Sequence, residues 1–212
     1  MSDETSKQDL SERLGLIESM IAEGRRSTTR WAWTIVLWGV AFYVAIAWSS
    51  GFLGGPIWGQ HYMAWPVTMV GTWLLSWGLA TRMRQNAKAP MTTMKRAIIS
   101  IWTAMGISMF ALLLPMGLSG RADQQVCVAV VVTLLGTANA ASGFLLKWKA
   151  QIACAIVWWL AATASLFGTV TQSSIAFLVA IFFCQIVFGI YAMILESREA
   201  SREQRRQGAA NA

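Results

Sequence analysis

Six long apolar runs, free of aspartate, glutamate, lysine and arginine, constrain this chain more than any other feature. They cover about residues 31–50, 62–81, 97–116, 125–146, 150–170 and 174–195. Each matches the length of about 20 residues that an α-helix needs to cross a lipid bilayer. Only 13% of the residues are charged, whereas a soluble domain carries about 25%. The sequence therefore predicts an all-α protein, a six-transmembrane-helix bundle, with no separate soluble domain.

The basic residues predict the orientation of this bundle. With six spans, 16 of the 17 lysines and arginines fall on one side of the membrane, and the loops on the other side hold only Arg121. Lysine and arginine mark the cytoplasmic side. We therefore expect a multi-pass inner (cytoplasmic) membrane protein with both termini cytoplasmic. The expected regions are a cytoplasmic tail (1–30), a membrane domain (31–195) and a basic cytoplasmic tail (196–212).

The net charge of +7 lies, in this topology, beside the inner leaflet. Acidic lipid headgroups attract such basic clusters. The basic residues flank the spans and form no nucleic-acid-binding motif. We expect membrane lipid as a partner, and no nucleic acid.

The N-terminal tail is predicted to contain an amphipathic helix. Ser6 and Asp9 have the spacing of a capping box at its start. Its other polar residues are mostly acidic, unlike those of helices that lie on membranes. We expect its apolar face to contact protein, either in a homo-oligomer or another partner, or on the rest of this chain. We also expect it to touch the basic C-terminal tail, within a subunit or between neighbours. The apolar face consists of Leu10, Leu14, Ile17 and Ile21.

The spans lack the groups that membrane enzymes and ion-coupled transporters use. No ionisable acid or base lies within them, and His61 lies at the outer edge of the second. The cysteines, Cys127, Cys154 and Cys184, are expected at different depths, which excludes a disulfide and a cysteine metal site. We therefore expect no enzyme, no cofactor and no metal.

Four tryptophans fall nearer the middle of the membrane than the rest. Buried indole N–H groups need hydrogen-bond partners. These side chains either fill the core or line a pocket for an apolar ligand such as a lipid tail, quinone or pigment. The four candidates are Trp38, Trp73, Trp158 and Trp159.

The octet "GTANAASG" at 136–143 places an amide among small residues in the fourth span. Small residues allow helices to approach closely. Asn139 is a candidate polar residue, and Gln185 on the sixth span is its expected partner. The face is either a packing seam or part of a polar path. It comprises Thr133, Gly136, Asn139, Ala140 and Gly143.

Residues 16–39, "LIESMIAEGRRSTTRWAWTIVLWG", carry a resemblance to a known group. The stretch resembles the start of small bacterial six-span integral membrane proteins, in which an "IxxMI" helix precedes a span with "LLWGW". The resemblance implies the six-span architecture, and it implies no catalytic or binding residues. The matching positions are Ile17, Met20, Ile21, Leu37, Trp38 and Gly39.

Three functions remain open at this point. The first is a non-enzymatic membrane protein, regulatory, accessory or stress-related, that acts through helix packing and cytoplasmic contacts. The second is an oligomeric channel or facilitator lined by the octet face or by Thr68, Thr72 and Ser76. The third is a binder of an apolar ligand or lipid.

Overall fold

The computed structural model of this chain describes residues 2–29, 32–50, 64–84, 93–118 and 123–210. Within these ranges every regular element is helical and there is no strand, which confirms the all-α prediction. The predicted residues His61 and Arg121 lie outside the described ranges. The helices are α1 (Ser2–Thr29), α2 (Ala32–Ser49), α3 (Ala64–Arg84), α4 (Thr93–Leu118), α5 (Gln124–Leu145), α6 (Lys149–Phe167), α7 (Val170–Ile181), the π-helix η2 (Phe182–Val187) and α8 (Phe188–Ala210).

Five of the described helical segments are long and apolar enough to cross a membrane, so this is a multi-pass membrane protein. They are α2, α4, α5, α6 and the continuous segment Val170–Arg198, which runs through α7, η2 and into α8. The remaining predicted span, 62–81, falls on α3. Its 21 residues include Pro66, three tryptophans and two glycines, which lower its mean hydropathy. The crossing of the membrane by α3 therefore stays a prediction.

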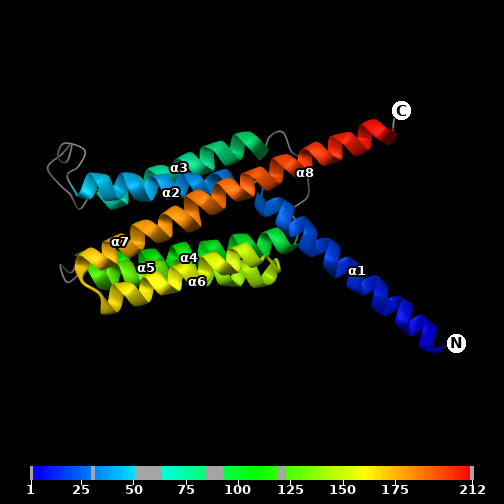
Figure 1. Ribbon diagram of the computed structural model, residues 1–212, viewed down its shortest axis with the longest axis horizontal. Helices are drawn as coiled ribbons and strands as arrows, with labels where there is room; N and C mark the ends of the chain where they lie inside the picture. The colour runs from blue at the N-terminus through cyan, green and yellow to red at the C-terminus, as the bar shows by residue number, and fades with distance from the viewer. Residues whose placement is uncertain (1, 30–31, 51–63, 85–92, 119–122, 211–212) are drawn as a thin grey trace.

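The helices form a bundle in which α2 and α3 lie together and α4, α5 and α6 form a second group (Figure 1). The α7–η2–α8 rod crosses between the groups: α7 contacts mainly α5 and α6, whereas η2 and α8 contact mainly α2 (Figure 1). Successive rods from α2 onward run in opposite directions, and both termini extend from the same end of the bundle (Figure 1).

The core contains large aromatic side chains from four helices. Phe42 of α2, Trp65 of α3 and Phe177 of α7 have ring centroids 5.8–6.4 Å apart. Trp158 of α6 lies 6.5 Å from Phe177 and is fully buried. Outside this core, every bundle helix exposes large apolar side chains, as expected of surfaces that face lipid rather than water.

The N-terminal helix α1 is longer than predicted and projects away from the bundle (Figure 1). It begins at Ser2, so Ser6 lies inside the helix and the predicted capping box is wrong. Gly24 is buried, and a side chain there would collide with Met94 of α4 and with Leu146. Leu16, off the predicted apolar face, is as exposed as Leu14 on it, so the structure does not confirm the amphipathic pattern.

Candidate functional site

The octet of α5 packs against α6. A Cβ atom on Gly136 would lie 2.6 Å from the indole ring of Trp159 and 3.2 Å from Cβ of Trp158. A Cβ atom on Gly143 would lie 3.0 Å from the backbone nitrogen of Ile152. The two helices thus approach closely at both glycines, which is the geometry of a packing seam. Thr133, predicted on the same face, is exposed instead.

The two intramembrane amides do not pair with each other. The side-chain amide of Asn139 donates to the carbonyl oxygen of Leu135, one turn earlier in α5, at 2.9 Å. Gln185 lies instead in the seam between η2 and α2, where a Cβ on Gly39 would be 2.7 Å from Gln185 Cβ. The expected Asn139–Gln185 hydrogen bond is therefore wrong. Asn139 satisfies its N–H group within its own helix, and Gln185 packs on a different neighbour.

A second glycine completes the seam between α2 and the last rod. A Cβ on Gly189 of α8 would lie 2.6 Å from Val36 Cγ2 and 3.2 Å from the Val36 backbone nitrogen. Gly39 and Gly189 thus have no side chain at the points where the helices approach closely. The sequence analysis did not predict this seam. Gly39 in the first predicted span and Gly189 in the last are the residues that could have indicated it.

The four candidate tryptophans do not line one cavity. Trp158 is fully buried in the aromatic core, and its indole Nε1 has no hydrogen-bond partner among the described residues. Trp159 is 40% exposed and covers Gly136. Trp73 is 51% exposed on α3, with its ring 5.1 Å from that of Trp77. Trp38 is half-buried on α2. Binding of an apolar ligand by these side chains stays a prediction.

Two of the three cysteines meet, contrary to the sequence-based expectation. The Cys184 thiol of η2 donates to the carbonyl oxygen of Cys154 on α6 at 3.4 Å. Both residues are buried and both thiols are free. Because α6 and α7 form a hairpin through Gly168 and Thr169, residues equally far from the turn lie at the same depth. Cys154 and Cys184 are each 15 residues from Thr169.

The α6–α7 turn is fixed by side-chain hydrogen bonds. Thr169 and Gln172 form a reciprocal capping box at the start of α7. From α5, the Gln125 side-chain amide donates to the carbonyl oxygens of Ser165 at 3.2 Å and Gly168 at 2.6 Å. These bonds tie three helices together at this end of the bundle and set the register of the α6–α7 hairpin.

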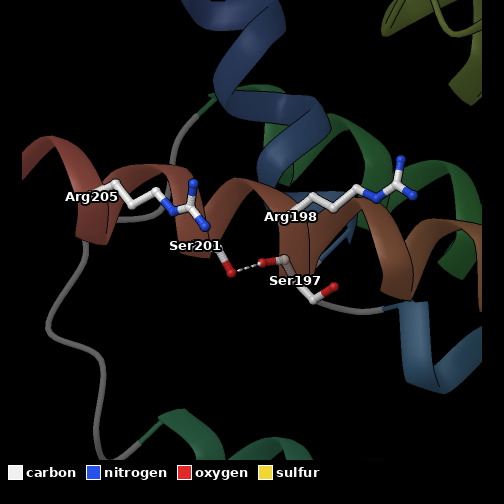
Figure 2. A pocket seen from close by; sticks show the side chains of 4 residues that line it. All are labelled: Ser197, Arg198, Ser201 and Arg205. Atoms are coloured by element: carbon white, nitrogen blue, oxygen red, sulfur yellow. Dashed lines mark hydrogen bonds between the residues drawn. The ribbon is translucent and has the colours of Figure 1, made fainter.

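Two shallow hollows lie at the other end, beside the termini. One, of about 340 Å³, is lined by two serines and two arginines on α8 (Figure 2). Figure 2 shows the hydrogen bond that the Ser201 hydroxyl group donates to the Ser197 carbonyl oxygen; the two oxygen atoms are 2.9 Å apart. The other, of about 200 Å³, is lined by Glu18, Ile21 and Ala22 of α1 and by Lys147. The arginines are Arg198 and Arg205.

Within the described ranges, no cluster of three or more histidine, cysteine or acidic side chains has the geometry to hold a metal ion. The buried polar groups are hydroxyls and amides, which fit helix packing better than acid–base chemistry. Comparison of the chain with protein-family models, with curated proteins and with solved structures finds no match.

Proposed function

We propose first that α3 is a sixth span and that both termini are cytoplasmic in a bacterial inner membrane. Two observations support the sixth span. α3 runs alongside α2 for most of its length (Figure 1). It also exposes a broad apolar surface that only lipid or another protein would cover. The exposed side chains are Val67, Val70, Trp73, Leu74, Leu75, Trp77 and Leu79.

Reporter fusions test this topology. Fusions after residues 90, 149 and 212 are expected to be cytoplasmic, and fusions after 55, 121 and 172 external, because 16 of the 17 basic residues then lie inside. Fusions after residues 55 and 90 that report the same side of the membrane would mean that α3 does not cross.

We further propose that the protein is a non-enzymatic membrane component, of a regulatory, accessory or stress-related kind, that acts through contacts at its cytoplasmic end. The observation that carries this proposal is α1. It projects from the bundle (Figure 1) and exposes large apolar side chains where water would surround them. Such a surface is typical of an interaction site. Those side chains are Leu10 (60% exposed), Leu14 (55%), Leu16 (63%) and Ile17 (51%).

The occupant that fits α1 best is α8 of a second copy. Among the described exposed charges of α1, Asp9 is paired with Arg13 at 3.0 Å, and Glu12 and Glu18 remain. The exposed hollow of α8 presents Arg198 and Arg205. Within one chain α1 contacts α8 beside the bundle, and beyond that contact the two helices diverge (Figure 1). We propose that these opposite charges pair between copies. The apolar side chains of α1 would supply most of the contact energy, because exposed ion pairs contribute only about 0–1 kcal/mol.

Charge reversal with rescue tests this contact. The readout is the oligomeric state by native mass spectrometry in detergent, with disulfide cross-linking of introduced cysteine pairs in native membranes. Arg198→Glu with Arg205→Glu is expected to weaken association. Adding Glu12→Arg and Glu18→Arg is expected to restore it. Gln8→Ala, at an exposed position on the same helix, is the matched control.

Two outcomes contradict the proposal. A monomer at all concentrations, with no cross-link, means that α1 binds another protein or none. Ion flux in liposomes that is lost together with the oligomer, and is also abolished by bulk in the α5–α6 seam, would favour the oligomeric channel instead.

A further inference from the structure

The exposed hollow on α8 continues directly from the apolar surface of the last span. Five residues of α8 follow one another at spacings of three or four and therefore share one face of the helix. The first two are apolar and exposed, and the last three line the hollow. The stripe changes from apolar to basic where the apolar segment ends. Its residues are Tyr191, Ile194, Arg198, Ser201 and Arg205.

Arg198 lies at the depth of lipid headgroups. It is four residues beyond Ile194, or about 6 Å further along the helix axis, and the headgroup layer of each leaflet is about 5–7 Å thick. Side chains of a helix lean toward its N-terminus, which in α8 is the membrane side. Figure 2 shows the side chains of Arg198 and Arg205 extending in this direction. Both guanidinium groups are therefore directed toward the headgroup layer.

The hollow offers an anion the hydrogen-bond donors of these two arginines. Among the described side chains, neither guanidinium group is paired with a carboxylate. The hydroxyl groups of Ser197 and Ser201 each donate to a backbone carbonyl oxygen one turn earlier, at 2.9 Å. The serines thus keep the surface between the arginines small, and the arginines supply the donors. A guanidinium group can bind two oxygen atoms of one phosphate at once.

We propose that this hollow binds the phosphate group of an anionic phospholipid in the leaflet beside the two termini. The phosphate lies between Arg198 and Arg205, and an acyl chain lies against Tyr191 and Ile194. A soluble phosphate would use the same guanidinium groups but would gain nothing from the apolar part of the stripe, so the lipid is the favoured source. The bound lipid competes with the acidic side chains of α1 from a second copy, proposed above to meet these arginines, but its binding does not require that contact.

The test is a titration of the full-length protein in detergent with dioleoylphosphatidylglycerol, in which native mass spectrometry counts the bound lipid. Arg198→Gln with Arg205→Gln is expected to weaken the tightest binding at least about tenfold, because hydrogen bonds to charged groups contribute that much. Arg82→Gln with Arg96→Gln is the matched control. It removes the same charge from exposed positions at the same end of the bundle (Figure 1) and is expected to retain binding.

Two further probes distinguish the source of the phosphate. Dioleoylphosphatidylcholine, which has no net charge, is expected to bind the unmodified chain more weakly than dioleoylphosphatidylglycerol. Ammonium phosphate, compared with ammonium acetate at equal ionic strength, is expected to leave the lipid bound. Equal binding of the two lipids overturns the proposal, and displacement of the lipid by ammonium phosphate overturns the assignment to a lipid.

An equal loss of binding in the two arginine double variants also overturns the proposal, because the lipid would then respond to overall charge alone. Thermal unfolding checks that both variants are folded, and either single variant replaces a double variant that is not. Glu12→Arg with Glu18→Arg removes the acidic partners of the contact between copies and is expected to keep the lipid bound. Failure of that contact therefore leaves this result unchanged.

Discussion

Replacing Gly143 by alanine is expected to separate the cost of overpacking from the effect of helix propensity. The added methyl carbon would lie 2.8 Å from Ile152 Cγ1 and 3.0 Å from the Ile152 backbone nitrogen. Comfortable contacts between carbon atoms are about 3.5–4.0 Å. Because one obstacle is backbone, the side chain alone cannot relieve the clash, and α6 must retreat by several tenths of an ångström. Overpacking of this kind costs about 1–3 kcal/mol.

The matched control is Gly106→Ala on α4, where no atom lies within 4 Å of the added carbon. Alanine favours a helix over glycine by about 1 kcal/mol in both variants, so this contribution cancels in the comparison. We expect Gly143→Ala to be less stable than Gly106→Ala by about 1–3 kcal/mol in denaturant titrations of detergent-solubilised protein. Gly136→Ala is expected to fall between them, because the half-exposed Trp159 ring can rotate away. Equal stability of Gly143→Ala and Gly106→Ala would refute the close approach of α5 and α6.

Other substitutions test the turn and the polar residue of the seam. Gln125→Leu removes two hydrogen bonds to carbonyl oxygens at the α6–α7 turn and is expected to lower the free energy of unfolding by about 1–3 kcal/mol. Gln124→Leu, which loses one exposed contact of 3.4 Å, is expected to change it by less than about 0.5 kcal/mol. Thr169→Ala removes the cap of α7 and is expected to cost about 0.5–2 kcal/mol, whereas Thr169→Ser retains the cap; thermal unfolding distinguishes them. Asn139→Ala loses a bond to its own helix that is worth about 0.6 kcal/mol in membrane bundles; liposome flux is expected to be unchanged, and an altered flux would indicate a polar path.

The spans were predictable because lipid imposes a length and an apolar composition on every crossing helix. The predicted run 125–146 and the helix Gln124–Leu145 differ by one residue at each end. The packing face of α5 was predictable for a related reason: glycine and alanine at helical spacing leave a groove for another backbone.

The choice of neighbour was not predictable from one sequence. Either α6 or the last span could have packed against the face of α5 that carries Asn139. The short Leu146–Trp148 connection places α6 there. The cysteine pair was missed because the sixth span was expected to begin at 174. It begins at Val170, immediately after a two-residue turn. Each cysteine is 15 residues from Thr169 in that turn, so Cys154 and Cys184 lie at the same depth.

The π segment determines how the two halves of the last rod are rotated relative to each other. An α-helix turns about 100° per residue, and one wide turn accommodates an extra residue without breaking the rod. Phe177 of α7 therefore faces the aromatic core while Gly189 of α8 faces Val36 of α2. A one-residue deletion within Phe182–Val187 that restores a regular α-helix would rotate the arginine-bearing surface of α8 by about 100° around the helix axis. The direction in which that surface points outside the bilayer is thus set by backbone geometry within the bundle.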